Sequence, residues 1–294
     1  MKVRIGISLG AAGIPGEFAD AIDDLERYGV DSLWLSELVY EPLVEPFVGM
    51  AYALSRTTRL KVGTGVSVLP GRHPVLVAKQ LASLAGLAPG RVLPVFGLRP
   101  ARPAEIPLFP APPGRRAALF DESLQLLRMM LENDSVSFTG EFFTVENASV
   151  GPRPAKPLDI WLGGSAPGAL RRIGRCGDGW LGSFITPAEA GRARAAIQEA
   201  AAAAGREVEA DHFGVSLAVA TEGIPPGLIA AARQRRPDAD PASLVAASWP
   251  DARRMIEEYI AAGLSKFVIR PAAAQPPAAR FLEQFVSEML PLQT

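Results

Sequence analysis

The chain alternates short apolar segments with longer amphipathic ones, and this alternation constrains its fold more than any other feature. Eight segments have the β-branched, apolar character of buried strands: 3–9, 32–36, 60–68, 91–97, 158–163, 179–183, 213–220 and 266–270. Segments with helical periodicity separate or follow them, at about 17–29, 44–55, 74–86, 115–132, 166–176, 187–204, 250–262 and 277–289. Strands that alternate with helices predict a parallel sheet with helical crossovers.

Eight such units favour a (β/α)8 TIM barrel, an α/β fold, over an open doubly wound sheet. Barrels of this length are commonly one domain, so we expect residues 1–294 to form a single domain. In a barrel the active site lies at the carboxyl ends of the strands. Two long insertions follow strands 4 and 7, at 99–114 and roughly 222–248, and we expect them to cover this site.

These insertions differ in composition. Segment 99–114 holds six prolines and is expected to lack regular structure, whereas 222–248 is expected to contain short helices. A further segment, 134–146, has the pattern of a small hairpin that turns at Thr139-Gly140.

The charge balance argues against a nucleic-acid partner. The 30 basic and 31 acidic residues are mixed along the chain and give a net charge of −1. No run of about 18 uncharged apolar residues predicts a membrane span, and the start MKVRIGISLG has the pattern of a strand rather than of a signal peptide. The single cysteine, Cys176, excludes an internal disulfide. We therefore expect a cytoplasmic protein with a small-molecule partner.

The clearest local signal for a ligand is IWLGGSAPGALRRIG at 160–174. A strand ends in Gly163-Gly164, and Ser165 is expected to cap the next helix. Free amides at a helix start and the helix dipole both favour an anion. A second such start follows in GSFITPAEA, where Ser183 and Thr186 offer hydroxyl groups. The two starts predict a phosphate site, although the glycines alone would also suit a tight turn.

Few other residues indicate a catalytic centre. The two histidines have no metal-ligand spacing, and no metal site is predicted. No nucleophile elbow, Rossmann fingerprint or P-loop occurs. Glu37 follows the second strand and is either catalytic, a ligand acceptor or a partner of Arg72, while His73 is either a catalytic group at the rim or a helix cap. So few acids and bases favour a cofactor that supplies the redox chemistry.

Five stretches stand in a characteristic order: DSLWLSE, LKVGTGVSVLPGRHPVLVAKQLASL, GRRAALFDESLQLLRMML, VSFTGEFFTVENASVGPRPAKPLDIWLGG and ALRRIGRCGDGWL. Together they resemble the bacterial luciferase-like family of flavin- and F420-dependent oxidoreductases over nearly the whole chain. The resemblance implies a barrel with a flavin or deazaflavin ring at its carboxyl mouth, usually in a homodimer. It also implies a non-proline cis peptide at Gly65-Val66, behind the ring.

The candidate cofactor contacts are Gly65, Val66, Gly163, Gly164, Ser165, Ser183, Thr186 and Arg270. The chain departs from the family at two places. Leu38 stands where relatives commonly have a histidine, and Arg99 begins a proline-rich segment where many have glycines. Both are candidate substrate contacts, and Glu37 and His73 are the candidate catalytic residues.

Three functions follow as hypotheses. The favoured one is an oxidoreductase that uses coenzyme F420 for hydride transfer to or from a small organic substrate. The first alternative is an FMN-dependent luciferase-like monooxygenase, in which a sealed mouth protects reduced flavin chemistry from water. The second is a non-catalytic flavin-binding barrel, which the leucine at position 38 and the altered fourth loop favour.

Overall fold

The computed structural model describes residues 2–221, 223–272 and 278–294. Within them the main sheet consists of β1 (Arg4–Ile7), β2 (Ser32–Leu35), β3 (Lys61–Thr64), β4 (Ser67–Val68), β5 (Val92–Leu93), β6 (Val95–Gly97), β9 (Trp161–Gly163), β10 (Gly179–Ser183), β11 (Phe213–Val219), β12 (Val245–Ala246) and β13 (Lys266–Pro271). Ten strands form one path, β4-β6-β9-β10-β11-β13-β1-β2-β3-β5, and β12 pairs with β11. All these pairs are parallel.

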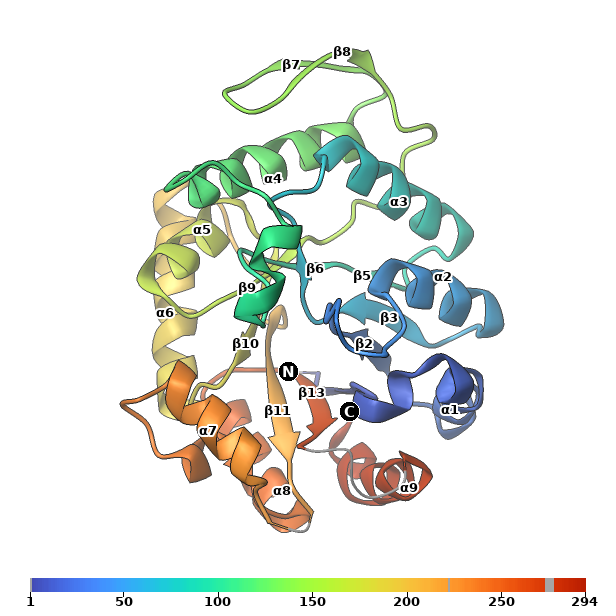
Figure 1. Cartoon of the computed structure of the whole chain (residues 1–294), viewed down its shortest axis with the longest axis vertical. Helices are drawn as coiled ribbons and strands as arrows, with labels where there is room; N and C mark the ends of the chain where they lie inside the picture. Colours follow the sequence, from blue (N-terminus) through green and yellow to red (C-terminus); the bar gives the residue numbers. More distant parts are fainter. Residues whose placement is uncertain (1, 222, 273–277) are drawn as a thin grey trace.

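Helices surround this curled sheet (Figure 1). They are α1 (Pro15–Tyr28), α2 (Pro46–Arg56), α3 (Pro74–Leu87), α4 (Arg116–Glu132), α5 (Pro167–Cys176), α6 (Pro187–Ala203), α7 (Pro226–Arg235), α8 (Trp249–Ala261) and α9 (Ala278–Met289). Except for α7, each matches a helix expected from the sequence to within two residues. In α1, for example, Phe18, Ile22 and Leu25 are buried on one face, and Gly29 ends the helix in the left-handed conformation. None of the described helices is long and apolar enough to cross a bilayer.

Three of the expected strands are interrupted or shortened. A cis peptide joins Gly65 to Val66 between β3 and β4, as expected. Pro94, which has no N–H to donate, separates β5 from β6. The strand expected at 158–163 begins only at Trp161, because the Ile160 N–H donates to the Asp178 carboxylate instead of to a neighbouring strand.

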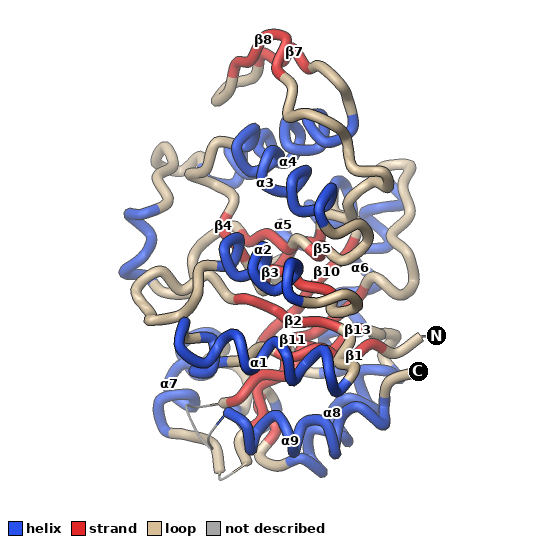
Figure 2. The backbone as a smooth tube through the Cα atoms, turned by 90° about the vertical axis from the view of Figure 1, so that its right-hand side faces the viewer, coloured by secondary structure: helices blue, strands red, loops and turns tan. Residues whose placement is uncertain are grey.

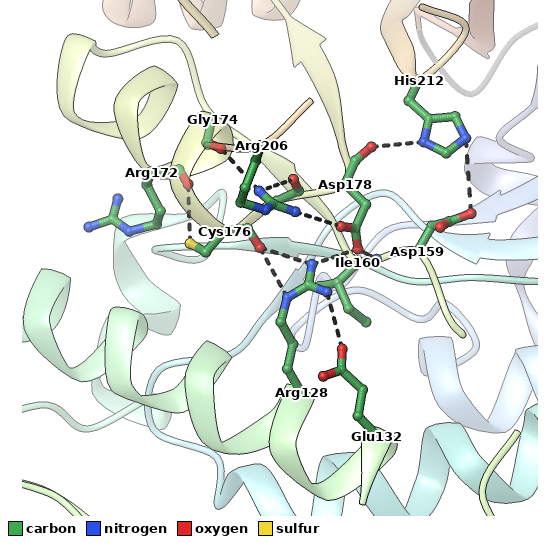
Figure 3. A network of polar contacts seen from close by, with 11 residues as sticks. Arg128, Glu132, Asp159, Ile160, Arg172, Gly174, Cys176, Asp178, Arg206 and His212 are labelled. Carbon is green, nitrogen blue, oxygen red and sulfur yellow. Dashed lines mark hydrogen bonds and ion pairs between the residues drawn. The ribbon is translucent and has the colours of Figure 1, made fainter. Parts of the chain in front are cut away.

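An ionic network around Asp178 joins several elements at the amino ends of the strands (Figure 3). The Asp178 carboxylate accepts from Arg128 on α4 at 2.5 Å and from Arg206, which precedes β11, at 3.0 Å. The backbone oxygen of Asp178 lies 2.8 Å from Nδ1 of His212. We call Asp178, Arg128, Arg206 and His212 the Asp178 network. It joins α4 to the segments that lead into β9, β10 and β11.

The hairpin expected at 134–146 is present as β7 (Val136–Thr139) and β8 (Thr144–Ala148), but its turn lies later than expected. The turn comprises residues 140–143 rather than Thr139-Gly140, because Thr139 still pairs with Thr144. One carboxylate, that of Glu122, accepts the N–H groups of residues 141, 142 and 143 at 2.8 Å each and so holds the turn. Figure 2 shows the hairpin projecting from one end of the molecule, apart from the main sheet.

Two long loops lie at the carboxyl ends of β6 and β11. The proline-rich segment after β6, expected to be irregular, contains a 3-10 helix, Pro103–Leu108, which proline at its first position suits. The segment after β11 contains α7 and a 3-10 helix, Pro241–Ser243, so the expected short helices are present. It also contributes β12, which the sequence did not indicate.

Candidate functional site

A cavity of about 780 Å³ lies at the carboxyl ends of the strands. Strand ends form its walls, and parts of the two long loops line its mouth. Clefts of this size are typical of sites for cofactors and small molecules. Nine of the residues expected from the sequence line it, namely Glu37, Leu38, Gly65, Val66, Arg99, Gly164, Ser165, Ser183 and Arg270. Gly163, His73 and Thr186 are not among the lining residues.

Glu37 is a buried carboxyl group in the cavity wall. It forms an ion pair with Arg72, as one interpretation of the sequence held, and it accepts the Val68 N–H at 2.7 Å. Burial raises the pKa of Glu37, and this effect exceeds the opposing effects of Arg72 and of the Val68 N–H. The Arg72 guanidinium carbon also lies 5.7 Å from the ring centroid of Phe47 and 5.6 Å from that of Phe109. The acid is therefore held in one position.

Two glycines of the third strand have different surroundings. A Cβ atom placed on Gly63 would lie 2.4 Å from the Leu93 carbonyl oxygen, so close approach of the backbones requires glycine there. A Cβ atom on Gly65 would have Trp34 Cβ as its nearest neighbour, at 3.6 Å. Gly65 lines the cavity. Because it has no side chain, a flat ring has room to lie against its backbone.

Gly163 makes room for the neighbouring wall residue. A Cβ atom on Gly163 would lie 3.1 Å from Cγ1 of Val66, and one on Gly97 would lie 2.7 Å from its Cγ2. The Val66 side chain thus packs between these two glycines of β6 and β9, where a larger residue would clash with it. Gly163 therefore has a packing role next to the cavity.

The two helix starts expected to bind phosphate differ in the structure. The N-cap residue of α5 is Ala166 rather than the expected Ser165, and no side chain caps this helix. Gly164 adopts a φ of +111°, which favours glycine. The start of α6 is closed by its own residues, because Thr186 and Glu189 form a capping box. Hydrogen bonds from Arg236 and Thr186 lower the pKa of Glu189 to about 2. A carboxylate already stands at the α6 start, which leaves the α5 start as the better anion site.

His73 has a capping position. Its Nδ1 accepts the Val75 N–H at 3.3 Å at the start of α3, and its exposed ring packs edge-on against Phe143 with centroids 5.3 Å apart. This geometry supports the interpretation of His73 as a cap, and a catalytic role for it remains a prediction. Thr186 is engaged in the same way by its own helix.

Contacts between loops define the mouth of the cavity. Glu105, fully buried in the proline-rich loop, accepts the Tyr40 N–H at 3.0 Å, and Arg102 pairs with Glu41. From the other long loop, Arg235 donates to the Ala101 carbonyl at 3.3 Å. The two long loops and the loop after β2 thus meet over the site.

Sequence reasoning missed Phe184 and Arg235 at this mouth. Phe184 has a left-handed backbone with a φ of +51°, and its ring lies 4.7 Å from the guanidinium carbon of Arg235. The guanidinium of Arg270 lies over the same ring at 5.3 Å. No periodicity in the sequence marks such a contact between distant segments.

A group of potential metal ligands lies elsewhere. Ligand atoms of Glu209, Asp211 and His212 lie within 4.8 Å of one another, just before β11. This places them at the amino ends of the strands, away from the cavity. Exposed acids of this kind are common on protein surfaces, and the cluster adds nothing to the site.

Comparisons with known proteins agree with this geometry. A family model described as luciferase-like monooxygenase matches residues 2–224. An uncharacterised protein of Mycobacterium tuberculosis is 36% identical over 166 residues, which cover 56% of this chain and 57% of that protein. An F420-dependent glucose-6-phosphate dehydrogenase of Nakamurella multipartita is 32% identical over 61% of this chain and 56% of its own length. The chain thus spans little more than half the length of these relatives.

Among solved structures, an F420-dependent secondary alcohol dehydrogenase in complex with an F420-acetone adduct superimposes with a TM-score of 0.82. The two chains are 18% identical, and the superposition covers 100% of both. At this identity the likeness concerns the fold: strands and helices follow the same course in both molecules.

Proposed function

Because the chain belongs to the luciferase-like monooxygenase family, we propose that it is an oxidoreductase that uses coenzyme F420 for hydride transfer to or from a small organic substrate. One observation carries the proposal: the cavity is lined both by Gly65, which has no side chain, and by Gly164 and Ser165, which lead into the uncapped start of α5. A ring and a phosphate are the two parts that such an arrangement suits. The F420-dependent relative named above supports this cofactor.

We propose that two parts of the cavity bind the cofactor. The backbone at Gly164 and Ser165 and the hydroxyl of Ser183 would hold its phosphate, and the wall at Gly65 and Val66 would lie behind its ring. When bound, F420 supplies a ring carbon that gives or accepts a hydride. The protein orients the two reactants and keeps water from them.

Glu37 is the acid that we propose for proton transfer to the substrate. Its carboxyl lies in the cavity wall, and burial raises its pKa, which favours the protonated form that a proton donor needs. Leu38 and Arg99 line the same cavity and are proposed to contact the substrate. Arg72 positions the carboxyl through their ion pair.

The finer architecture is part of the proposal. We propose that residues 1–294 form a single, closed (β/α)8 barrel with insertions after its fourth and seventh strands. Closure is supported by the two ends of the strand path, β4 and β5, because β4 directly follows β3 in the chain and β5 directly precedes β6. The segment of β3 and β4 thus pairs with the segment of β5 and β6 at both ends of the path. We also propose a cytoplasmic homodimer, in which exposed apolar side chains on α2 and α3 meet their counterparts. Val48, Tyr52 and Leu76, exposed by 64%, 43% and 66%, support this surface.

A titration distinguishes the cofactors. Cofactor-free protein is mixed with F420 and, separately, with FMN while cofactor fluorescence is followed. Quenching at micromolar F420 but not at similar FMN is the expected result. Binding of FMN alone would favour the monooxygenase alternative, and binding of neither would refute both. Binding of F420 without turnover of any of a panel of alcohols, aldehydes and sugar phosphates would favour a non-catalytic barrel.

A charge placed at the start of α5 tests the phosphate site. Ser165→Asp is expected to weaken F420 binding by about tenfold or more, because the new carboxylate repels the phosphate. Ser149→Asp makes the same change at an exposed serine beside the distant hairpin, and it is expected to leave affinity unchanged. Equal affinities for the two variants would place the phosphate elsewhere.

A further inference from the structure

Two arginines at the mouth of the cavity share one aromatic ring. Arg235, on α7, and Arg270, on β13, both place their guanidinium groups over Phe184, with carbon-to-centroid distances of 4.7 and 5.3 Å. The Phe184 side chain is buried, and Arg236 holds the backbone of this residue by donating to its carbonyl at 3.0 Å. All three side chains of this arrangement line the cavity.

The closeness of these two charges is unfavourable on its own. Burial and, as a smaller effect, the charge of Arg235 together lower the pKa of Arg270 to about 10. Interaction with the face of an aromatic ring offsets only part of the cost of bringing two cations together. An anion between or beside them would remove the repulsion.

Two neighbouring arginines at the mouth of the cavity form ion pairs with carboxylates. Arg102 pairs with Glu41, and Arg236 pairs with both Glu189 and Asp238. Within the described ranges, no carboxylate pairs with Arg235 or Arg270. The one hydrogen bond described for Arg235 goes to a backbone carbonyl, that of Ala101, and leaves most of its donors available.

We propose that Arg235 and Arg270 bind an anionic group of the substrate against the Phe184 ring. Guanidinium groups present paired N–H donors that match the oxygens of a phosphate or carboxylate. Two such groups carry enough charge for a doubly charged phosphate monoester. The inference rests on the proposed function, since it names a property of the substrate, and it moves Arg270 from the cofactor to the substrate.

The two arginines lie apart from the residues proposed to bind the phosphate of the cofactor. The proposed phosphate site of the cofactor lies at the carboxyl ends of β9 and β10, whereas Arg270 belongs to β13, which β11 separates from β10. Arg235 comes from the loop after β11 and contacts the loop after β6. An anion held there would lie beside the contact between the two long loops, at the mouth of the cavity.

Calorimetry with simple anions tests the inference. Inorganic phosphate and, separately, acetate are titrated into cofactor-free protein at constant ionic strength. Arg270→Gln and Arg235→Gln are each expected to weaken phosphate binding by about tenfold or more. The matched control is Arg233→Gln, which removes the same charge from an exposed position on α7 outside the cavity lining. It is expected to change affinity less than about twofold.

The outcomes separate this inference from the proposed function. F420 affinity is expected to stay within a few-fold of the original in both variants. Loss of F420 binding in Arg270→Gln would return this residue to the cofactor and overturn the inference. So would phosphate binding that Ser165→Asp abolishes and Arg270→Gln does not. Failure of the unaltered protein to bind F420, with phosphate binding still dependent on the two arginines, would refute the proposed function alone.

Two further comparisons complete the test. Acetate is expected to bind more weakly than phosphate through the same two arginines, and equal affinities would identify a carboxylate substrate rather than a phosphate ester. If Arg270→Gln fails to fold, the Arg235→Gln variant decides. Arg235 is exposed, and its replacement removes its contact with the Phe184 ring and one hydrogen bond to a backbone carbonyl. Unchanged phosphate affinity in a folded Arg235→Gln variant would overturn the inference.

Discussion

Glu37 shows how one buried carboxyl group links the stability of the protein to its chemistry. In the unfolded chain it titrates near its ordinary value of 4.5, whereas burial raises its pKa in the folded protein. Between these two values the folded state holds a proton that the unfolded state has lost. The contribution of Glu37 to stability is therefore fully present below pH 4.5 and is lost as pH rises through the folded pKa.

The direction of this pH dependence can be measured by comparing the original protein with the Glu37→Gln variant. The free energy of unfolding of the original protein, relative to that of Glu37→Gln, is expected to fall as pH rises from 4 to 7, because the glutamine does not titrate. Urea unfolding at four pH values measures it. A relative stability that rises with pH would mean that the Arg72 ion pair outweighs burial, contrary to the direction argued here.

The glycines of the third strand make a second prediction at the residue scale. Gly63→Ala is expected to lower the free energy of unfolding by about 1–3 kcal/mol, because its methyl group would meet a backbone oxygen that cannot move aside. Gly65→Ala meets nothing closer than 3.6 Å and is expected to cost less than about 1 kcal/mol while weakening F420 binding. Urea unfolding and cofactor fluorescence measure the two effects. If both variants lose stability equally, the surroundings described for Gly65 are wrong.

At the scale of elements, the hairpin of β7 and β8 depends on a side chain outside it. Glu122 of α4 accepts three consecutive N–H groups of the turn. Glu122→Ala leaves these groups to water and is expected to lower the free energy of unfolding by about 1 kcal/mol. Amide hydrogen exchange at 141–143 should become about tenfold faster, with F420 affinity unchanged.

A matched variant separates the turn from general surface charge. Glu141→Gln removes an exposed ion pair with Arg115 and keeps the Glu122 acceptor. Its effect on stability is expected to be small, about 0–1 kcal/mol, with slow exchange preserved. Fast exchange in Glu141→Gln as well would show that the turn does not depend on Glu122.

Elements were predictable where a local pattern determines them. The helices at 74–87 and 187–203 begin with proline after a capping residue, and their ends follow from the periodicity of apolar side chains. The same positions also supplied candidate site residues. His73 and Thr186 were selected for their chemistry, and both cap helices in the structure, which is a common use of threonine and of other polar side chains at these positions. Their roles in the site stay predictions.

Contacts over the cavity were not predictable from the chain alone. Glu105 meets Tyr40, and Arg235 and Arg270 meet Phe184, across separations in sequence that carry no periodic signal. Phe184 also adopts a left-handed backbone, which bulky residues seldom do. Such contacts depend on how loops fold over a finished sheet, so single-sequence patterns identify the strand ends that surround the site but not the residues that close it.

For the whole molecule, the proposed dimer makes a testable prediction. Leu76→Asp places a charge among the exposed apolar side chains of α2 and α3 and is expected to give a monomer by light scattering. Leu87→Asp is the control, because Leu87 is 83% exposed at the opposite end of α3 and lies about 16 Å along the helix. A dimer that survives Leu76→Asp, or one that Leu87→Asp dissociates instead, would place the interface elsewhere.

The Asp178 network and the cavity occupy opposite ends of the same strands. Charged pairs that hold helix to sheet stand at the amino ends, while the groups proposed to bind ligands stand at the carboxyl ends. A mutation at the mouth therefore leaves the network intact. Duplicated copies of such a gene can therefore change their substrate by substitutions in the two long loops while the contacts that stabilise the fold stay the same. We expect natural sequence variation to be greater in these loops than at Asp178.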